Sequence, residues 1–400
     1  MTKLLLRYPY FLRFWIATIA SQLASRMHSL ILIWLVYSWS NSALVVGITM
    51  VSASLPSILI SPFAGSLVDR QDKIILMYIS DLVRMGVMLG FAYLFYIDML
   101  NTTLLIIGTA IVSIASAFFN PAAMSILPQL VDTEDITRAN AIGQISASAS
   151  SIIGPLFGST LIVTLGATNA FVGASVLFVI SILFLYSIRD RDFEPSHTDS
   201  SLWQDIKGSF DLIKQYDIVY NMITKMSIVN FFFSSLVIIA PIIADGNAKN
   251  IAYLMSSIGA GMLASSLLFS SKKFDIEPNI FLSTCLLLMG IAFALLASTD
   301  SLYLQNLYIF MIGASLNAFN IILISIYQTR LPQENLGKIM AFIVAISLSL
   351  QPISYGVMGV VIRYLGVSSV LTMSGIVIVA SAYGVYGLKN LNPNFRLNKE

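Results

Sequence analysis

The run LLLMGIAFALLAS, Leu286 to Ser298, contains no charged residue, and runs of this kind recur along the whole chain. Hydrophobic side chains make up 57% of the 400 residues and charged ones only 10%, whereas soluble domains carry roughly 25% charged residues. One helical crossing of a bilayer needs about 20 apolar residues. A membrane β-barrel would instead show segments of about ten residues with alternating polarity. The sequence therefore predicts an all-α polytopic membrane protein with twelve transmembrane helices.

The basic residues indicate how these spans are oriented. If both termini lie on one side of the membrane, most of the 22 Lys and Arg side chains lie at the span ends on that same side. Lys249 and Arg363 fall on the other side. Cytoplasmic loops carry this excess of Lys and Arg. We expect both termini to be cytoplasmic and the protein to lie in the inner or plasma membrane.

One long polar stretch divides the spans into six and six. It is RDRDFEPSHTDSSLWQDIKGSFDLIKQYD, Arg189 to Asp217, and its later part places Leu202, Ile206, Phe210 and Ile213 at helical spacing. A helix with one apolar face suits a membrane interface. We predict an N-terminal six-helix bundle at 1–188, a cytoplasmic linker with an interfacial helix at 189–217, and a C-terminal six-helix bundle at 218–400.

The two halves also share short motifs in the same order. Phe119-Asn120 recurs as Phe319-Asn320, and Pro155 is matched later by Pro352. Repeats of this kind are typical of transporters whose substrate site lies near the membrane midplane between the halves. The sequence therefore predicts two pseudo-symmetric bundles.

Few residues could perform covalent or metal chemistry. The chain has one cysteine, Cys285, and two histidines, His28 and His197, too few for a nucleophilic or thiolate metal site. The sequence contains no Gly-x-x-x-x-Gly-Lys-Ser/Thr loop, so we do not expect ATP to drive it directly. We expect no enzyme activity, no cofactor, no metal and no nucleic-acid partner. The expected partners are a small-molecule substrate and the lipid bilayer, with the chain as a monomer.

The loop after the second span carries a family motif. GSLVDRQDKIILMYISDLVR, Gly65 to Arg84, resembles the loop Gly-x-x-x-Asp-Arg-x-Gly-basic-basic of the major facilitator superfamily. Asp72 stands where that family usually has glycine. The resemblance implies the major facilitator fold, with helices 1, 4, 7 and 10 lining a central cavity. It also implies a cytoplasmic gate, for which the candidate residues are Gly65, Asp69, Arg70, Lys73 and Arg84. The alternative is a solvated charged turn.

Two further stretches resemble an exporting branch of this superfamily. SIIGPLFGS contains Gly154, Pro155 and Gly158, and it is similar to the helix-5 motif of the superfamily's antiporters. The run from Phe118 to Ser148 is similar to the macrolide-efflux and enterobactin-exporter group. These resemblances imply export by alternating access. The alternative for the helix-5 motif is an ordinary packing face of small residues.

The first span carries two unusual residues, Arg26 and His28. At 100° per residue, Gln22, Arg26 and Ser29 share one face, and His28 lies about 160° from Arg26, near Ser21 and Ser25. We expect the Arg26 face to point into the cavity. The candidate substrate-binding residues are Gln22, Arg26, Ser29, Asn120, Asn221, Lys225, Asn230, Asn317 and Asn320.

These candidates indicate what the cargo carries. Arg26 and Lys225 are basic, and we expect every acidic residue, Asp81 included, to lie near a span end. A positive cavity favours an anionic cargo, which predicts a carboxylate or siderophore-like compound. Alternatives are a macrolide or multidrug efflux pump, and a non-transporting receptor or accessory subunit. Arg26 could also be a structural anchor, Lys225 could extend its ammonium group to the membrane surface, and the asparagines could serve helix packing.

The expected energy source is an ion gradient, most simply of protons. His28 is the mid-span side chain whose unperturbed pKa lies in the physiological range. The candidates for carrying the coupling proton are His28 and Asp81, which makes an antiporter the favoured mechanism.

Overall fold

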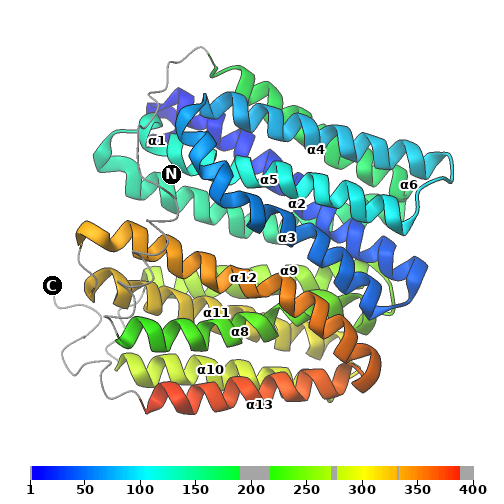
Figure 1. Cartoon of the computed structure of the whole chain (residues 1–400), viewed down its shortest axis with the longest axis vertical. Helices are drawn as coiled ribbons and strands as arrows, with labels where there is room; N and C mark the ends of the chain where they lie inside the picture. Colours follow the sequence, from blue (N-terminus) through cyan, green and yellow to red (C-terminus); the bar gives the residue numbers. More distant parts are fainter. Residues whose placement is uncertain (1, 190–216, 272–276, 331–332, 388–400) are drawn as a thin grey trace. The chain divides into compact units, whose positions relative to one another are not determined.

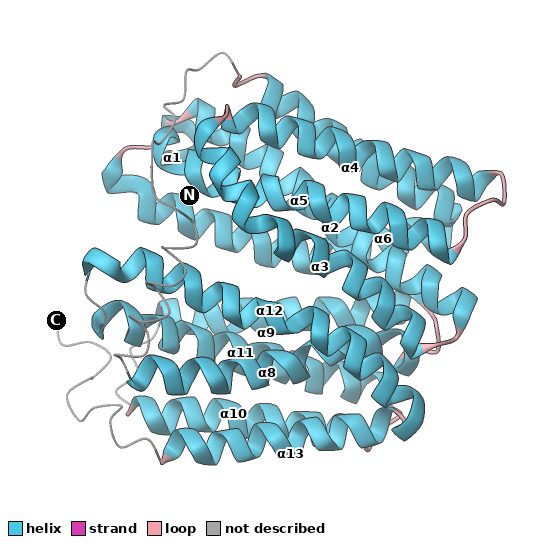
Figure 2. Cartoon of the chain, in the orientation of Figure 1, coloured by secondary structure: helices cyan, strands magenta, loops and turns pink. Residues whose placement is uncertain are grey.

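The computed structural model describes residues 2–189, 217–271, 277–330 and 333–387, and within these ranges the regular structure is entirely helical (Figure 2). The interfacial helix predicted in the linker lies outside the described residues. The elements before the linker are α1 (Thr2–Arg7), α2 (Pro9–Ser40), α3 (Ala43–Arg70), α4 (Lys73–Tyr96), α5 (Thr102–Leu130), a 3₁₀ turn (Thr133–Asp135) and α6 (Ile136–Tyr186). Those after it are α8 (Asp217–Ile243), α9 (Ala248–Ser271), α10 (Pro278–Leu296), α11 (Leu302–Arg330), α12 (Gln333–Leu365) and α13 (Val367–Tyr386).

The prediction of twelve transmembrane helices is confirmed. In the described part of the chain, 10 helices are long and apolar enough to cross a membrane. One of these, α6, has 51 residues, about 75 Å of helix, which is enough for two crossings of a hydrocarbon core of about 30 Å. The remaining crossing is α12, whose 33 residues include Pro352.

A single glycine separates the two crossings within α6. Gly166 has φ 84° and ψ 169°, a backbone region open essentially only to glycine. Gly366 has nearly the same conformation, φ 78° and ψ 167°, between α12 and α13. Each glycine follows a leucine, at the same position in its half of the chain. The chain therefore reverses direction at one residue, in the same way, in both halves.

The chain divides into two compact units with the same helix pairings. The first contains α1 to α6, the second contains α8 and α10 to α13, and α9 is divided after Ser256. In the first unit α6 packs against α2 and α4, and α4 also packs against α5. In the second, α12 packs against α8, and α10 packs against α13 and α11, with α10 and α13 side by side in Figure 1. This repeat supports the pseudo-symmetry expected from the sequence, while the predicted domain limits stay a prediction.

A hydrophobic cluster closes one end of the first unit. Leu4 and Leu5 of α1 are both 8% exposed and join a core that includes Phe11 of α2, Val68 of α3 and Leu185 of α6. The short first helix is therefore part of the bundle core at this end, because its two leucines are removed from water there.

The two reversals predict a specific sensitivity to substitution. We expect Gly166→Ala to destabilise the protein by about 1–3 kcal/mol, because alanine at this φ is strained although its Cβ would meet nothing within 4 Å. Thermal unfolding of the purified protein in detergent measures the effect. Gly86→Ala in α4 is the matched control, since its Cβ also meets nothing and alanine favours a helix. An unchanged Tm for Gly166→Ala would contradict the assigned conformation.

Candidate functional site

The first span has two chemically different faces. Ser21 and His28 are 1% and 6% exposed and lie inside the first unit, whereas the side chain of Arg26 is exposed and those of Gln22 and Ser29 are partly exposed. This is the division that helical spacing predicts. Two buried polar atoms, Gln22 Oε1 and His28 Nε2, have no hydrogen-bond partner in the described part of the chain.

The glycines of the helix-5 motif lie against this span. A Cβ on Gly154 would come within 2.5 Å of Arg26 Cβ, and one on Gly158 would be 3.3 Å from Leu30 Cδ2. Both glycines therefore let α6 approach α2 closely, as small residues do between membrane helices. Pro155 lies between them and is buried. This contact favours the packing interpretation of the motif, and its link to antiport stays a prediction.

Two enclosed charges, Asp81 and Arg84, lie on α4. They are 0% and 3% exposed and form an ion pair one turn apart. The expectation that Asp81 lies near a span end is wrong, because Asp81 is about two turns inside α4 and is fully enclosed. Arg84 lies with it inside the bundle, and its assignment to the gate stays a prediction. Charges in a membrane interior are costly unless they are paired, and here each supplies the other's partner.

Hydroxyl groups from two other helices complete the bonding of Asp81. Ser21 of α2 donates to Oδ1 at 3.0 Å, and Ser181 of α6 donates to Oδ2 at 2.5 Å. Both carboxylate oxygens therefore accept a hydrogen bond in addition to the ion pair. Asp81 joins α2, α4 and the second crossing of α6.

Arg84 contacts two aromatic rings as well as polar groups. Its carbon Cζ lies 4.5 Å from the ring centre of Phe119 and 5.1 Å from that of Phe178, distances at which a cation is attracted to an aromatic face. Nη1 donates to Ser25 Oγ and Nε to the Ser80 carbonyl, each at 3.4 Å. The pair thus adds α5 to the helices it joins.

The predicted gate is described only in part. Gly65, Asp69 and Arg70 lie in the final turns of α3, and their side chains fall outside the described residues. Lys73 begins α4 and is 2% exposed. Asp72 caps α4, since its Oδ1 accepts from the backbone N–H of Ile74 at 2.8 Å and of Ile75 at 3.2 Å. The aspartate at the family's usual glycine position thus starts the helix, and the gate stays a prediction.

Two polar candidates of the second unit, Asn317 and Lys225, contact neighbouring helices. Asn317 Nδ2 on α11 donates to the Met262 carbonyl at 2.9 Å, to Ser265 Oγ at 2.8 Å and to Ser266 Oγ at 2.9 Å, all on α9. Lys225 Cε on α8 lies 3.2 Å from where Gly384 of α13 would carry a Cβ. The first contact favours a packing role for Asn317. The second favours the interpretation in which Lys225 extends along the bundle toward the end of α13.

The remaining candidate asparagines differ in exposure. Asn230 is 8% exposed, Asn320 is partly exposed and Asn120 is exposed. The side chain of Asn221 falls outside the described residues. Phe119 and Phe319, which precede the repeated asparagines, are both buried. The repeated dipeptide therefore has a buried aromatic ring followed by a more accessible amide in each half.

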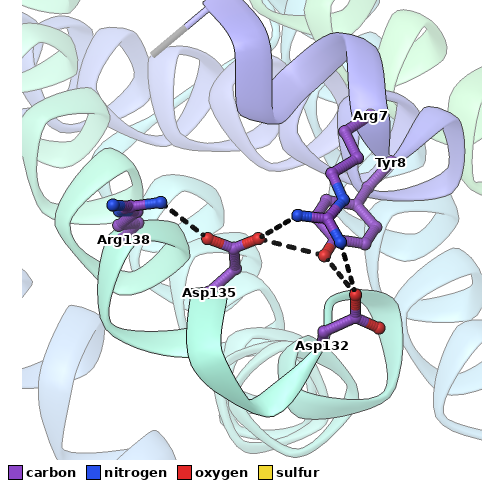
Figure 3. Close-up of polar contacts among 5 residues, drawn as sticks. All are labelled: Arg7, Tyr8, Asp132, Asp135 and Arg138. Atoms are coloured by element: carbon purple, nitrogen blue, oxygen red, sulfur yellow. Dashed lines mark hydrogen bonds and ion pairs between the residues drawn. The ribbon is translucent and has the colours of Figure 1, made fainter.

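A polar cluster that the sequence analysis did not find ties α1 to the turn after α5 (Figure 3). The Tyr8 hydroxyl donates to Asp132 Oδ2 at 2.6 Å and to Asp135 Oδ2 at 3.0 Å. Arg7 pairs with both acids, and Arg138 pairs with Asp135. The hydrogen bond to Asp132 raises the pKa of Tyr8 to about 12, so the hydroxyl keeps its proton at physiological pH. No local pattern signals this cluster, because its partners lie far apart in the chain.

Metal chemistry has no ligand set in the described residues. No group of three or more His, Cys, Asp or Glu side chains that could hold an ion occurs among them. The arrangement in the first unit consists of one exposed cation on α2 and one enclosed ion pair behind it.

Comparison with known proteins finds a matching family, distant relatives in sequence and a similar fold. A sequence model described as the Major Facilitator Superfamily matches residues 14–354. Macrolide efflux protein A of Streptococcus pyogenes is 22% identical over 389 residues, covering 93% of this chain and 94% of that protein. The putative bacilysin exporter BacE of Bacillus subtilis is 26% identical over 246 residues, 60% of this chain and 61% of that one. The crystal structure of a bacterial homologue of the iron transporter ferroportin, in an inward-facing state, superimposes with a TM-score of 0.72 at 14% identity, covering 94% of this chain and 98% of that chain.

The enclosed ion pair predicts a large effect of removing one charge. We expect Asp81→Asn to cost about 3–5 kcal/mol of stability, because Arg84 is left charged without its partner inside the bundle. Thermal unfolding and yield of monodisperse protein measure this cost. Asp98→Asn, which removes an exposed acid at a helix end, is the control. An Asp81→Asn protein as stable as the parent would show that the pair is not needed for folding.

Proposed function

We propose a function that starts from the family: this chain belongs to the Major Facilitator Superfamily, and we infer that it is a secondary active exporter of a small organic metabolite. The similarity to macrolide efflux protein A along nearly the full length of both chains carries this proposal. Alternating access between two six-helix units fits the repeated helix pairings. Both termini lie in the cytoplasm by the distribution of Lys and Arg, the membrane is the inner or plasma membrane, and the protein acts as a monomer.

Arg26 indicates the chemical class of the cargo. Its side chain is exposed on α2, while the enclosed acid Asp81 is engaged by Arg84, Ser21 and Ser181. Asp81 therefore does not serve as the counter-charge for a cationic cargo. An arginine presents two parallel N–H groups to a carboxylate. We assign the cargo as an anionic, carboxylate-bearing compound of the siderophore kind.

A macrolide or other drug is the second candidate cargo. The observation in its favour is the name of the relative that aligns over 94% of its own length, macrolide efflux protein A. A neutral or cationic drug gains no ion pair with Arg26 and must displace its hydration. Dependence of export on Arg26 therefore separates the two candidates.

The proposed energy source is proton antiport. His28 is buried in the first unit, and its Nε2 has no partner among the described residues. The groups found near it are the ring of Phe91 and the charge of Arg84, itself paired with Asp81. Asp81 already accepts from two serines, so His28 is the better placed of the two candidates for carrying the coupling proton.

The cargo assignment predicts a loss of transport in Arg26→Gln. Metabolite profiling of the medium of cells with and without the gene identifies the compound, and proteoliposomes with an imposed pH gradient measure its flux. A charge-assisted hydrogen bond contributes about 1.5–3 kcal/mol, so we expect KM for the acidic compound to rise about tenfold or more.

Arg13→Gln is the matched control, because Arg13 also lies on α2 but donates to the Ser187 carbonyl at the end of the unit. Flux at the parental KM in Arg26→Gln would reject the anionic cargo. Macrolide export by the parent, unaffected by Arg26→Gln and without any carboxylate export, would support the drug candidate. Absence of all gradient-driven flux in the parent would leave the receptor or accessory-subunit alternative.

The coupling assignment predicts a separate effect of His28→Gln. Substrate binding should persist, whereas accumulation driven by an imposed pH gradient in inverted vesicles should be lost, since glutamine cannot take up a proton. Counterflow of labelled substrate without a gradient is the control for intact binding and exchange. Gradient-driven uptake with the parental pH profile would exclude the histidine.

A further inference from the structure

We propose that the first unit binds one phospholipid against α4, and that the head of this lipid carries a phosphate and a primary ammonium group, as in a phosphatidylethanolamine. The binding site has one charge of each sign at its polar end and apolar walls beyond them. It is separate from Arg26 and from the enclosed ion pair. The lipid is therefore a ligand of this protein whatever the cargo is.

The site is a groove of about 430 Å³ between the start of α4 and the end of α6. Volumes of this size are typical of ligand pockets. Asp72 follows the second crossing of the chain and Arg189 follows the sixth, so both lie at the membrane surface on the side of the N-terminus. The groove therefore faces the lipids of that leaflet, with its charged end at the level of their heads.

Arg189 supplies the positive charge of the groove. Its Cζ lies 4.3 Å from the ring centre of Tyr186, a distance at which a cation is attracted to an aromatic face. Both residues line the groove. A guanidinium has five N–H donors, so it can bond the oxygens of a phosphate while it keeps other contacts. Arg189 is therefore suited to the phosphate that every phospholipid head carries.

Asp72 supplies the negative charge of the same groove. It is exposed, and the two backbone N–H groups that it caps both donate to Oδ1. A carboxylate has a second oxygen with its own lone pairs, so Oδ2 can accept from an ammonium group. Basic residues are common at this surface of a membrane protein, whereas Asp72 stands where the family's loop usually has glycine. The acid is therefore the feature that distinguishes this groove.

The two charges together select among lipid heads. An ethanolamine head offers its phosphate to Arg189 and three N–H donors to Asp72. A choline head has the same charges, but methyl groups replace those donors. A glycerol head has no positive charge to place beside Asp72. Charge-assisted hydrogen bonds are roughly twice as strong as neutral ones, so the ethanolamine head fits the pair best.

The apolar walls suit the acyl chains. Ile75 and Ile79 of α4 are 50% and 48% exposed, and Ile79 lies about 9 Å into the helix. A second groove, of about 270 Å³, runs between α4 and α5, and Ile79 lines both grooves. The lining of the second groove includes Val83, Ile111 and Phe118. Two grooves that meet at one side chain can hold the two chains of a single lipid.

Native mass spectrometry of the whole protein in detergent tests the preference. The probes are three synthetic lipids with identical oleoyl chains and with ethanolamine, choline or glycerol heads. We expect the ethanolamine lipid to bind about threefold or more tightly than the other two, which is the effect of one ion pair at a surface. Equal affinities for the ethanolamine and choline lipids, or tighter binding of the glycerol lipid, overturn the proposal.

Two variants separate the charges. Asparagine also caps a helix, so Asp72→Asn should keep the parental Tm while the ethanolamine and choline lipids become equal in affinity. Arg189→Gln should weaken binding of all three lipids, because each carries a phosphate. The matched controls are Asp98→Asn, beyond the other end of α4, and Lys249→Gln, since both residues are exposed. An Asp72→Asn protein that keeps the parental preference rejects the site.

Cross-linking in cell membranes identifies what occupies the groove. The photoreactive residue p-benzoylphenylalanine replaces Ile75 in one protein and, as the control, Leu89 in another, because Leu89 is 44% exposed on the same helix farther from the charged end. Adducts at position 75 should be enriched in ethanolamine phospholipid relative to position 89, and Asp72→Asn should remove the enrichment. A cross-link to another segment of this chain or to another protein would show a different occupant and overturn the proposal.

Discussion

An ion pair enclosed among helices in a membrane can persist only if its geometry satisfies both charges, because lipid offers no substitute for water. Asp81 and Arg84 meet this condition with hydroxyls from α2 and α6 and rings from α5 and α6. The helices of the first unit supply these partners. The two faces of α2 differ accordingly: Ser21 and His28 lie toward the ion pair, and Arg26 lies away from it.

The number of spans could be predicted because the relevant signal is local. Polar residues and glycines interrupt the apolar runs at each loop, so the lengths follow directly from bilayer thickness. The conformation of the glycine between the fifth and sixth spans was not predicted. Gly166 and Gly366 repeat at the same place in each half, and comparison of the dipeptides Leu165-Gly166 and Leu365-Gly366 could have revealed the shared reversal.

The candidate site could be predicted only in part, because its decisive contacts are not local. Helical spacing separates Arg26 from His28 correctly, since that requires one helix alone. The enclosure of Asp81 depends on Ser21 and Ser181, which are 60 and 100 residues away in the chain. A sequence signal did exist: an acid and an arginine three residues apart on an apolar helix can pair with each other. The number of residues between Asp81 and the preceding loop did not indicate how deeply its side chain is buried.

The one-residue reversals also bear on how this protein enters the membrane and how it can be probed there. Two crossings joined by one glycine have no flexible loop between them that could remain in the aqueous phase while the second crossing inserts. The two crossings of α6 therefore partition into lipid as a hairpin, as do α12 and α13. For the same reason, these two joints offer an added protease or antibody no extended segment to recognise, and topology mapping must rely on the longer loops.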